Sequence, residues 1–322
     1  MPDSCSVTRR TFLSHSAALA AATSIPAGAL AQEGIQSREI PGTGERLPLV
    51  GLGSPDFFYT TPEGGNNDAA KELIRTMYEI GGRMIDTPAF FRPDPPVLGA
   101  ILQEMNLQNE LFLVGKITFE NEGREAAIQH VNTTIENMGR QQLDLMLLHN
   151  LRDSDNFWPV LKEAKAEGKV RYIGVSEATD NIPNEVLEDF MRKHSPDFIM
   201  PSYSMFRPQI EERILPLAAD MGTAVIAIEV FKTFDDGAYF SDTAGKGLPE
   251  WAAEFDCESW AQFALKYVLS HPAVTCSAVE TSQPRHIIDN MGAAFGRLPD
   301  QATRARMAAH FYSLRKIPEV MN

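Results

Sequence analysis

The stretch LFLVGKITFENEGREAAIQHVNTTIENMGRQQLDLMLLH, at residues 111–149, determines the fold class. Its two apolar runs, LFLVGKI and LDLMLLH, have the length and composition of buried strands. Between them, REAAIQHVNTTIENMG shows helical spacing and ends in a glycine, a usual helix stop. Near-continuous apolar strands separated by helices are typical of a parallel sheet covered by helices. The stretch therefore predicts a strand–helix–strand unit.

The same alternation continues in both directions along the chain. Including the two above, eight short apolar runs occur, at residues 47–53, 83–87, 111–117, 143–149, 172–177, 198–204, 224–230 and 274–280. Eight strand–helix units of this length fit the α/β class and a (β/α)8 TIM barrel. REIPGTGERLPLV (38–50) predicts an N-terminal β-hairpin that closes the barrel floor, and FKTFDDGAYFSDTAGKGLPEW (231–251) predicts a lid over the mouth.

The first 31 residues have the pattern of a twin-arginine signal peptide. Arg9-Arg10 precedes an alanine-rich apolar run, which ends in the Ala29-Leu30-Ala31 cleavage pattern. The run is too short to span a membrane, and no cysteine follows it to take a lipid anchor. We therefore expect recognition by the twin-arginine export machinery and a periplasmic location. No Pro/Ser-rich linker interrupts the remainder, so residues 32–322 are predicted to form a single barrel domain.

Charge and cysteine content exclude several classes of function. The chain carries a formal net charge of −14, and removal of the leader, which carries +1, makes it −15. Such an acidic protein is a poor ligand for nucleic acid or anionic membranes. After removal of the leader, the remaining cysteines are Cys257 and Cys276. Two cysteines do not make a disulfide framework. Both are expected to be buried thiols.

Polar residues end most of the predicted strands, where the catalytic residues of such barrels lie. Asp86, Lys116 and His149 end three consecutive strands. A buried Asp–Lys pair keeps the lysine charged and fixed, and a histidine beside it can donate a hydrogen bond to a substrate carbonyl. One histidine and one aspartate are a poor ligand set for a metal, so no metal site is predicted. The other strand ends carry Ser176, Glu177, Tyr203, Glu229 and Glu280.

These strand ends and their neighbours resemble the aldo-keto reductase family from residue 38 to about residue 295. The motifs that carry the resemblance occur in order: IPGTGERLPLVGLGS (40–54), GGRMIDT (81–87), LFLVGK (111–116), LDLMLLHN (143–150), EGKVRYIGVSE (167–177), YSMFRP (203–208) and SQPRHIIDNMGAA (282–294). The resemblance implies NAD(P)-dependent carbonyl or alcohol redox chemistry on a small-molecule substrate.

The resemblance implies a catalytic group of an aspartate, a tyrosine, a lysine and a histidine. In this chain the tyrosine is missing. Asp86, Lys116 and His149 match three positions, whereas Phe91 occupies the place of the tyrosine that donates the proton. Phenylalanine cannot donate, and loss of a positioned general acid typically costs about 10²–10⁴-fold in rate. His149 can take over the acid role if its pKa is near neutral, and Tyr59 is a second candidate.

The positions that hold the nicotinamide in the family are also altered. Ser176 matches the serine that binds the nicotinamide amide, but Glu177 replaces an asparagine and Met200 a glutamine. Tyr203 resembles the residue that stacks on the nicotinamide ring. After the seventh strand, Glu229-Val230-Phe231-Lys232 replaces a Ser-Pro-Leu type of turn, and Lys232 is placed to meet a pyrophosphate.

The last motif bears on the choice of dinucleotide. Glu280 stands at a lysine-like position and His286 at an arginine-like position, where NADP-preferring members bind the 2′-phosphate. Because a carboxylate repels phosphate and accepts from ribose hydroxyls, NAD is favoured over NADP. Asp289 and Asn290 match the pair that holds the adenine, and Thr281 and Ser282 are expected at the ribose or phosphate edge.

Two functions remain open from the sequence. The intact Asp86, Lys116 and His149 favour an oxidoreductase of aldo-keto reductase type with an altered proton donor. Phe91, Glu177 and Met200 together favour the alternative, a catalytically divergent barrel that binds a ligand or partner, or a non-redox enzyme that uses Lys116 and His149.

Overall fold

The computed structural model describes residues 34–53, 67–87, 98–118, 123–178, 182–233 and 238–315. Eight parallel strands close into a barrel in chain order, with the last strand next to the first. They are β3 (Val50–Leu52), β4 (Met84–Asp86), β5 (Phe112–Ile117), β6 (Leu143–His149), β7 (Val170–Ser176), β8 (Phe198–Met200), β9 (Ala224–Ala227) and β10 (Cys276–Val279). Each strand lies within or overlaps one of the apolar runs, so the predicted barrel is confirmed.

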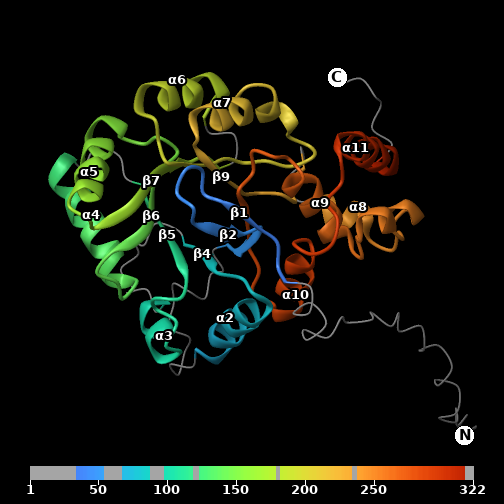
Figure 1. The fold of residues 1–322 in the computed structure, drawn as a ribbon, viewed down its shortest axis with the longest axis horizontal. Coiled ribbons are helices and arrows are strands. Elements are labelled where there is room, and N and C mark those ends of the chain that lie inside the picture. Colours follow the sequence, from blue (N-terminus) through green and yellow to red (C-terminus); the bar gives the residue numbers. More distant parts are fainter. Residues whose placement is uncertain are drawn as a thin grey trace, which may run out of the picture.

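Helices surround this barrel (Figure 1). Those between or after the strands are α2 (Asp68–Ile80), α3 (Leu98–Glu104), α4 (Gly123–Asn137), α5 (Ser154–Ala166), α6 (Asn184–His194), α7 (Ile214–Met221), α9 (Trp260–Leu269) and α10 (Pro284–Gly292). Helices α8 (Ala238–Thr243) and α11 (Gln301–Arg315) and the 3-10 turns η2 (Pro208–Glu211) and η3 (Glu250–Phe255) complete the described elements. None of the helices in the described ranges is both long and apolar enough to cross a membrane.

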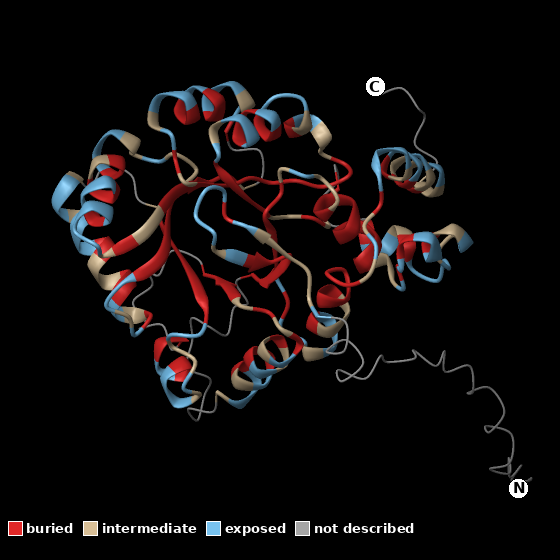
Figure 2. Cartoon of the chain, viewed as in Figure 1, coloured by how far each residue is buried: buried red, intermediate tan, exposed pale blue. Residues whose placement is uncertain are grey.

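The buried residues form two layers, one inside the barrel and one between the strands and the helices (Figure 2). The inner layer fills the barrel, as in other barrels of eight strands, with Ile40, Leu47, Met84, Phe112, Val114, Leu145, Leu147, Phe198, Met200, Ala224, Ile226, Cys276 and Ala278. Cys257 and Cys276 are free and buried, as predicted. Because side chains pack the barrel interior, ligands are expected at its mouth.

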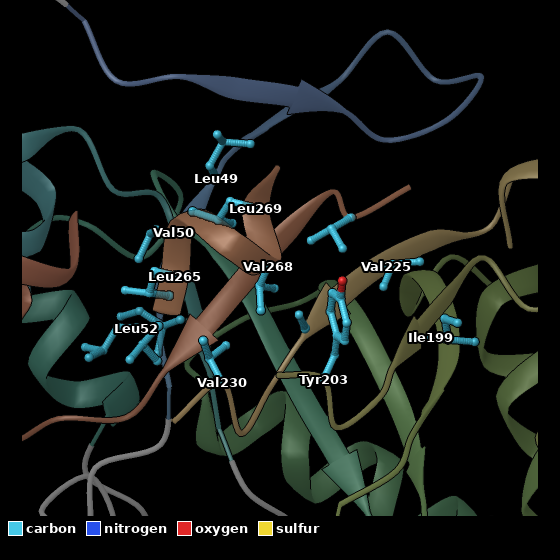
Figure 3. Packing of buried hydrophobic residues seen from close by; sticks show 14 of the residues in the cluster. Leu49, Val50, Leu52, Ile199, Tyr203, Val225, Val230, Leu265, Val268 and Leu269 are labelled. Carbon is cyan, nitrogen blue, oxygen red and sulfur yellow. The ribbon is translucent and has the colours of Figure 1, made fainter. Parts of the chain in front are cut away.

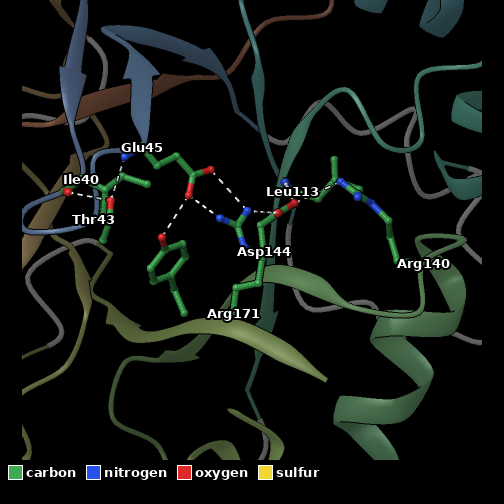
Figure 4. A network of polar contacts seen from close by, with 8 residues as sticks. Ile40, Thr43, Glu45, Leu113, Arg140, Asp144 and Arg171 are labelled. Atoms are coloured by element: carbon green, nitrogen blue, oxygen red, sulfur yellow. Dashed lines mark hydrogen bonds and ion pairs between the residues drawn. The ribbon is translucent and has the colours of Figure 1, made fainter. Parts of the chain in front are cut away.

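The N-terminal hairpin closes the floor of the barrel, as the sequence predicts. Strands β1 (Ser37–Glu39) and β2 (Arg46–Pro48) pair antiparallel and cross the barrel in Figure 1. Glu45, in this hairpin, forms an ion pair with Arg171 of β7. Arg171 also bonds Asp144 of β6 at 2.8 Å, and the Asp144 carboxylate accepts from the Leu113 N–H at 2.9 Å (Figure 4). This network ties the floor to three strands and leaves the opposite end of the barrel for the site.

Candidate active site

The ends of β4 and β5 bring Asp86 and Lys116 together. The two strands pair in parallel, and the side chains are only 7% and 8% exposed. The Lys116 ammonium donates to the Asp86 carboxylate and to the Thr87 carbonyl oxygen, the latter at 2.7 Å. An isolated buried charge would be strongly unfavourable, and these two acceptors compensate the ammonium. The Lys116 side chain is therefore held in a fixed position by two acceptors.

His149 ends β6, and its imidazole is neutral at neutral pH. Burial and, to a smaller extent, the charges of Lys116 and Arg152 lower the pKa of His149 to about 4, against an opposing effect of Glu229. The acid role expected for His149 requires a pKa near neutral, and this condition is not met. The imidazole Nδ1 lies 2.8 Å from Oγ of Ser176, which is opposite His149 in the β6–β7 register.

Two carboxylates lie at the ends of β7 and β9, and Ser202 contacts both. The Ser202 N–H donates to Glu177 Oε2 at 3.2 Å, and its hydroxyl donates to Glu229. Lys232 Nζ donates to Glu229 Oε1 at 3.3 Å. Glu229 has φ = 57°, a left-handed conformation that costs a non-glycine residue about 1–3 kcal/mol. The Glu229 side chain is thus held at the mouth at the expense of backbone strain.

Two positions assigned to the nicotinamide face away from the mouth or are closed to it. Met200 is fully buried in the layer inside the barrel. Tyr203 is also fully buried, but its ring belongs to the layer between strands and helices (Figure 3). Its hydroxyl donates to Glu211 Oε1 at 2.8 Å and accepts from Arg304 at 2.6 Å. A ring held in this layer cannot stack on a cofactor, which corrects the role predicted for Tyr203.

A pocket of about 570 Å³ coincides with the residues assigned to the adenosine part of a dinucleotide. Its lining includes the predicted residues Phe231, Glu280, Thr281, His286, Asp289 and Asn290, together with Phe240, Thr243, Ala244, Ser259, Trp260 and Ala261. A volume in this range suits a group of nucleoside size. Of the residues predicted at the ribose or the phosphates, Ser282 and Lys232 do not line it: Ser282 is exposed just before α10, and Lys232 is engaged with Glu229.

Hydrogen bonds order the α10 side of this pocket. The Gln283 N–H donates to Thr281 Oγ1 at 3.1 Å, which supports the turn into the helix. Gln262 Nε2 donates to Asp289 Oδ1 at 3.0 Å. Asn290 is 4% exposed and lines the pocket. These contacts fix the Asp289 carboxylate and the turn at Thr281 before any ligand binds.

The residues present fit the two ends of a dinucleotide unequally. At the adenosine end, an ordered pocket carries carboxylate, amide and hydroxyl groups that suit a nucleoside. At the nicotinamide end, Glu177 replaces an amide and Met200 offers no hydrogen bond. In the described part of the chain, no group of three His, Cys, Asp or Glu side chains is placed to hold a metal ion. Phe91 and Tyr59 lie outside the described residues.

Sequence reasoning missed several residues of the site. Asn150 contacts His149, and Ser202 joins two carboxylates. Phe240 and Trp260 line the pocket from α8 and α9. The position of Asn150 directly after the strand-end histidine was a usable signal. Ser202 offered none, because its role depends on residues 25 and 27 positions away.

Comparisons with known proteins find aldo-keto reductases among the relatives of this chain. The chain is 27% identical over 194 residues to the aldo-keto reductase YhdN of Bacillus subtilis, a match that spans 56% of this chain and 57% of that protein. It is 26% identical over 253 residues to the glyoxal reductase of the same organism, with 77% and 83% covered. Thus the chain covers little more than half of the first relative and most of the second.

Solved structures share the fold. The glycerol dehydrogenase AKR11B4 from Gluconobacter oxydans superposes with a TM-score of 0.68 at 20% identity, covering 89% of this chain and 97% of that one. The holo form of the aldo-keto reductase AKR11C1 from Bacillus halodurans gives 0.67 at 19% identity, covering 86% and 96%. The profile of the aldo/keto reductase family matches residues 50–308, a span that includes the barrel strands, the Asp86–Lys116 pair, His149 and the pocket beside α10. The chain belongs to the aldo/keto reductase family.

Proposed function

We propose that this protein is an NAD(P)-dependent oxidoreductase that interconverts a small carbonyl compound and its alcohol, with an altered proton donor. The observation that carries the proposal is the buried Asp86–Lys116 pair beside the half-buried His149 at one end of the barrel. Perturbed pKa values cluster at functional sites, and this group lies at the end of the barrel where catalytic residues lie in such folds.

Each of these residues has a distinct role in the proposed chemistry. When bound, the dinucleotide supplies or accepts the hydride. Lys116 places positive charge where negative charge develops on the substrate oxygen, and Asp86 holds Lys116 in position. With Phe91 at the position of the family's tyrosine, no phenol supplies the proton. Because the imidazole of His149 is neutral at neutral pH, Lys116 is the cationic proton source among these three residues.

The pocket beside α10 supports NAD over NADP as the preferred cofactor. Glu280 lines the pocket at the position where a basic residue would meet the 2′-phosphate. A carboxylate there repels a phosphate but can accept hydrogen bonds from the ribose hydroxyls. His286, the other residue at this edge, lies 3.4 Å from Thr281 Oγ1 through its Nδ1.

Cofactor binding is testable through Trp260, which lines the pocket. Addition of NADH to the purified protein should quench Trp260 fluorescence, and a Trp260→Phe variant should lose that signal while Trp158 and Trp251 continue to emit. Absence of any change at millimolar NADH and NADPH would contradict the proposal.

Turnover is tested with small aldehydes and alcohols, beginning with glyoxal and glycerol because related proteins carry those names. A Phe91→Tyr variant should gain about 10²–10⁴-fold in aldehyde reduction, the usual contribution of a positioned acid. A Phe91→Tyr/Lys116→Met variant is the matched control and should lose that gain. If Phe91→Tyr binds cofactor and gains nothing, the nicotinamide end is unsuited to reduction.

A second candidate function is favoured by the nicotinamide end of the site. Glu177 and Glu229 place two carboxylates there through Ser202, and Met200 is buried. These features suit a barrel that binds a cationic or hydroxyl-rich ligand or a partner, or a non-redox enzyme using Lys116 and His149. Binding of such a ligand without any effect of dinucleotides on Trp260 would favour this candidate.

We also propose that the protein is exported by the twin-arginine route to the periplasm. The proposal rests on Arg9-Arg10, the apolar run and the Ala29-Leu30-Ala31 pattern, which lie outside the described residues. Cell fractionation of the full chain should find a shortened protein in the periplasm. An Arg9→Lys/Arg10→Lys variant should keep the longer form in the cytoplasm, and equal export of both would contradict the proposal.

A further inference from the structure

Asn150 lies in a backbone conformation that turns its side chain back to His149. Asn150, Leu151 and Asp153 have φ angles of 54°, 51° and 49°, all in the left-handed region. Asparagine tolerates this region better than most residues. The Asn150 N–H also donates to the Ser176 carbonyl oxygen at 2.7 Å. The segment after β6 is therefore tied to β7 at its first residue, next to the His149 ring.

The orientation of the Asn150 amide is determined by its partners. The Ala178 N–H donates to Asn150 Oδ1 at 3.0 Å, so the amide oxygen faces that N–H. The amide nitrogen, Nδ2, then lies 3.2 Å from Nε2 of His149. The flipped amide would direct N–H groups at the Ala178 N–H, an arrangement with two donors and no acceptor.

This orientation determines which nitrogen of His149 carries the proton. An amide NH₂ is a donor only, so Nε2 must accept. In a neutral ring the proton then lies on Nδ1, which donates to Ser176 Oγ at 2.8 Å. We propose that Asn150 is a positioning residue that holds His149 in the Nδ1–H tautomer and makes its Nε2 edge a hydrogen-bond acceptor.

The tautomer has a consequence for the ligand that His149 can contact. Nε2 carries no proton for a carbonyl oxygen, whereas a ligand hydroxyl can donate to Nε2 in place of Asn150. The edge thus selects an alcohol over a carbonyl compound as the bound partner. This consequence rests on the proposed function, but the tautomer itself does not, because it follows from contacts within the chain.

Charged groups around His149 favour the neutral ring that the inference requires. Lys116 on β5 and Arg152 in the segment after β6 oppose a positive charge on the imidazole, and Glu229 after β9 favours one. Burial of the ring has the largest effect, and all these effects together lower the pKa of His149 to about 4. At neutral pH the ring therefore has one proton, and its location is set by Asn150 and Ser176.

The inference is tested by nitrogen NMR of the histidine rings in the purified, ¹⁵N-labelled chain without added ligand. A His149→Gln variant identifies the His149 signals. At pH 7 we expect a protonated-type shift for Nδ1 and an unprotonated-type shift for Nε2. An Nε2–H tautomer, or an imidazolium, would overturn the proposal. Because no dinucleotide is present, the result is independent of whether the proposed cofactor binds.

An Asn150→Asp variant should reverse the preference, because a carboxylate accepts from Nε2–H and favours the charged ring. We expect a proton on Nε2 and at least a tenfold gain in proton affinity of His149. The matched control is Asn156→Asp, which makes the same change in the first turn of α5, where the Asn156 amide donates to Asp153. It should leave the His149 tautomer unchanged. An unchanged His149 tautomer in a folded Asn150→Asp variant would contradict the role of Asn150. If that variant does not fold, the wild-type spectrum still shows which nitrogen of His149 carries the proton.

Discussion

At the residue scale, replacing only one partner of the Asp86–Lys116 pair should strongly destabilise the folded protein. Lys116→Met leaves the Asp86 carboxylate buried without its ammonium, and such changes typically cost about 3–5 kcal/mol of folding free energy. The double variant Asp86→Asn/Lys116→Met should recover most of that loss, because no charge remains. Urea unfolding measures both.

The exposed pair of Lys169 and Glu167 supplies the control, since its side chains are 42% and 58% exposed. Lys169→Met should change stability by less than about 1 kcal/mol. If Lys116→Met and Lys169→Met lost the same amount of stability, the buried Asp86–Lys116 pair would contribute no more to folding than an exposed pair.

His149 should make the folded state sensitive to acid. Its pKa is lowered from 6.5 to about 4 on folding, so between those values the unfolded chain binds more protons and the protein becomes less stable as the pH is lowered. Once the pH is below both pKa values, the loss in the free energy of unfolding from His149 is about 3 kcal/mol. His149→Gln should lose less stability between pH 7 and pH 4 than the wild type. The pKa values of His194, His271 and His310 are also lowered, but these residues are common to both proteins and cancel in the comparison.

The sequence was a good guide to single residues only inside regular strands. Asp86, Lys116 and His149 end strands, where the alternation of side chains and the common direction of parallel strands determine where they meet. Tyr203 lies three residues beyond the end of β8, where no periodicity applies. Its direction is set by Glu211 and by Arg304, 101 residues further along, which a local pattern cannot reveal.

At the element scale, Arg304 connects α11 to residues that follow the strand β8. Arg304 donates to Tyr203 and to Glu211 at 2.6 and 2.8 Å, and its guanidinium lies over the Tyr267 ring. Arg304→Met should cost about 3 kcal/mol, because a mostly buried carboxylate and hydroxyl lose a charged donor. Arg306, on the same helix, pairs with Glu254 at side-chain exposures of 48% and 61%.

Arg306→Met is therefore the matched control for Arg304→Met and should cost about 1 kcal/mol or less. Chemical denaturation followed by circular dichroism compares the two variants. Equal losses would mean that α11 is held by its apolar face alone, through residues such as Met307 and Phe311.

The sequence predicts helices and strands well where the strand–helix alternation repeats, and less well where the chain departs from that alternation. The eight apolar runs correspond to the barrel strands, and the hairpin at residues 38–50 closes the floor. The segment at 231–251 was predicted only as a lid, yet it contains α8 and part of η3, and α8 lines the pocket. Helices this short have little periodicity, and they are stabilised mainly by contacts with distant parts of the chain.

At the scale of the whole molecule, the described fold joins an ordered end and an altered end of the proposed cofactor site. The adenosine end uses β10, α10, α9 and α8, whereas the mouth uses β4 to β9. A ligand that binds the first end can therefore be retained even if the second no longer suits hydride transfer. Family membership and pocket geometry support cofactor binding more directly than turnover, and the two need separate measurements.

Binding should be visible as a change in stability of the entire barrel. A ligand present at 100 times its dissociation constant adds about 2.7 kcal/mol to the free energy of unfolding, which for a chain of this size raises Tm by about 5 °C. We expect NAD to give the larger shift and NADP a smaller one at equal concentration, because Glu280 lines the pocket. Glu280→Gln should narrow the difference by removing the repulsion of the 2′-phosphate. A larger shift with NADP in the wild type would show that Glu280 does not set the choice of dinucleotide.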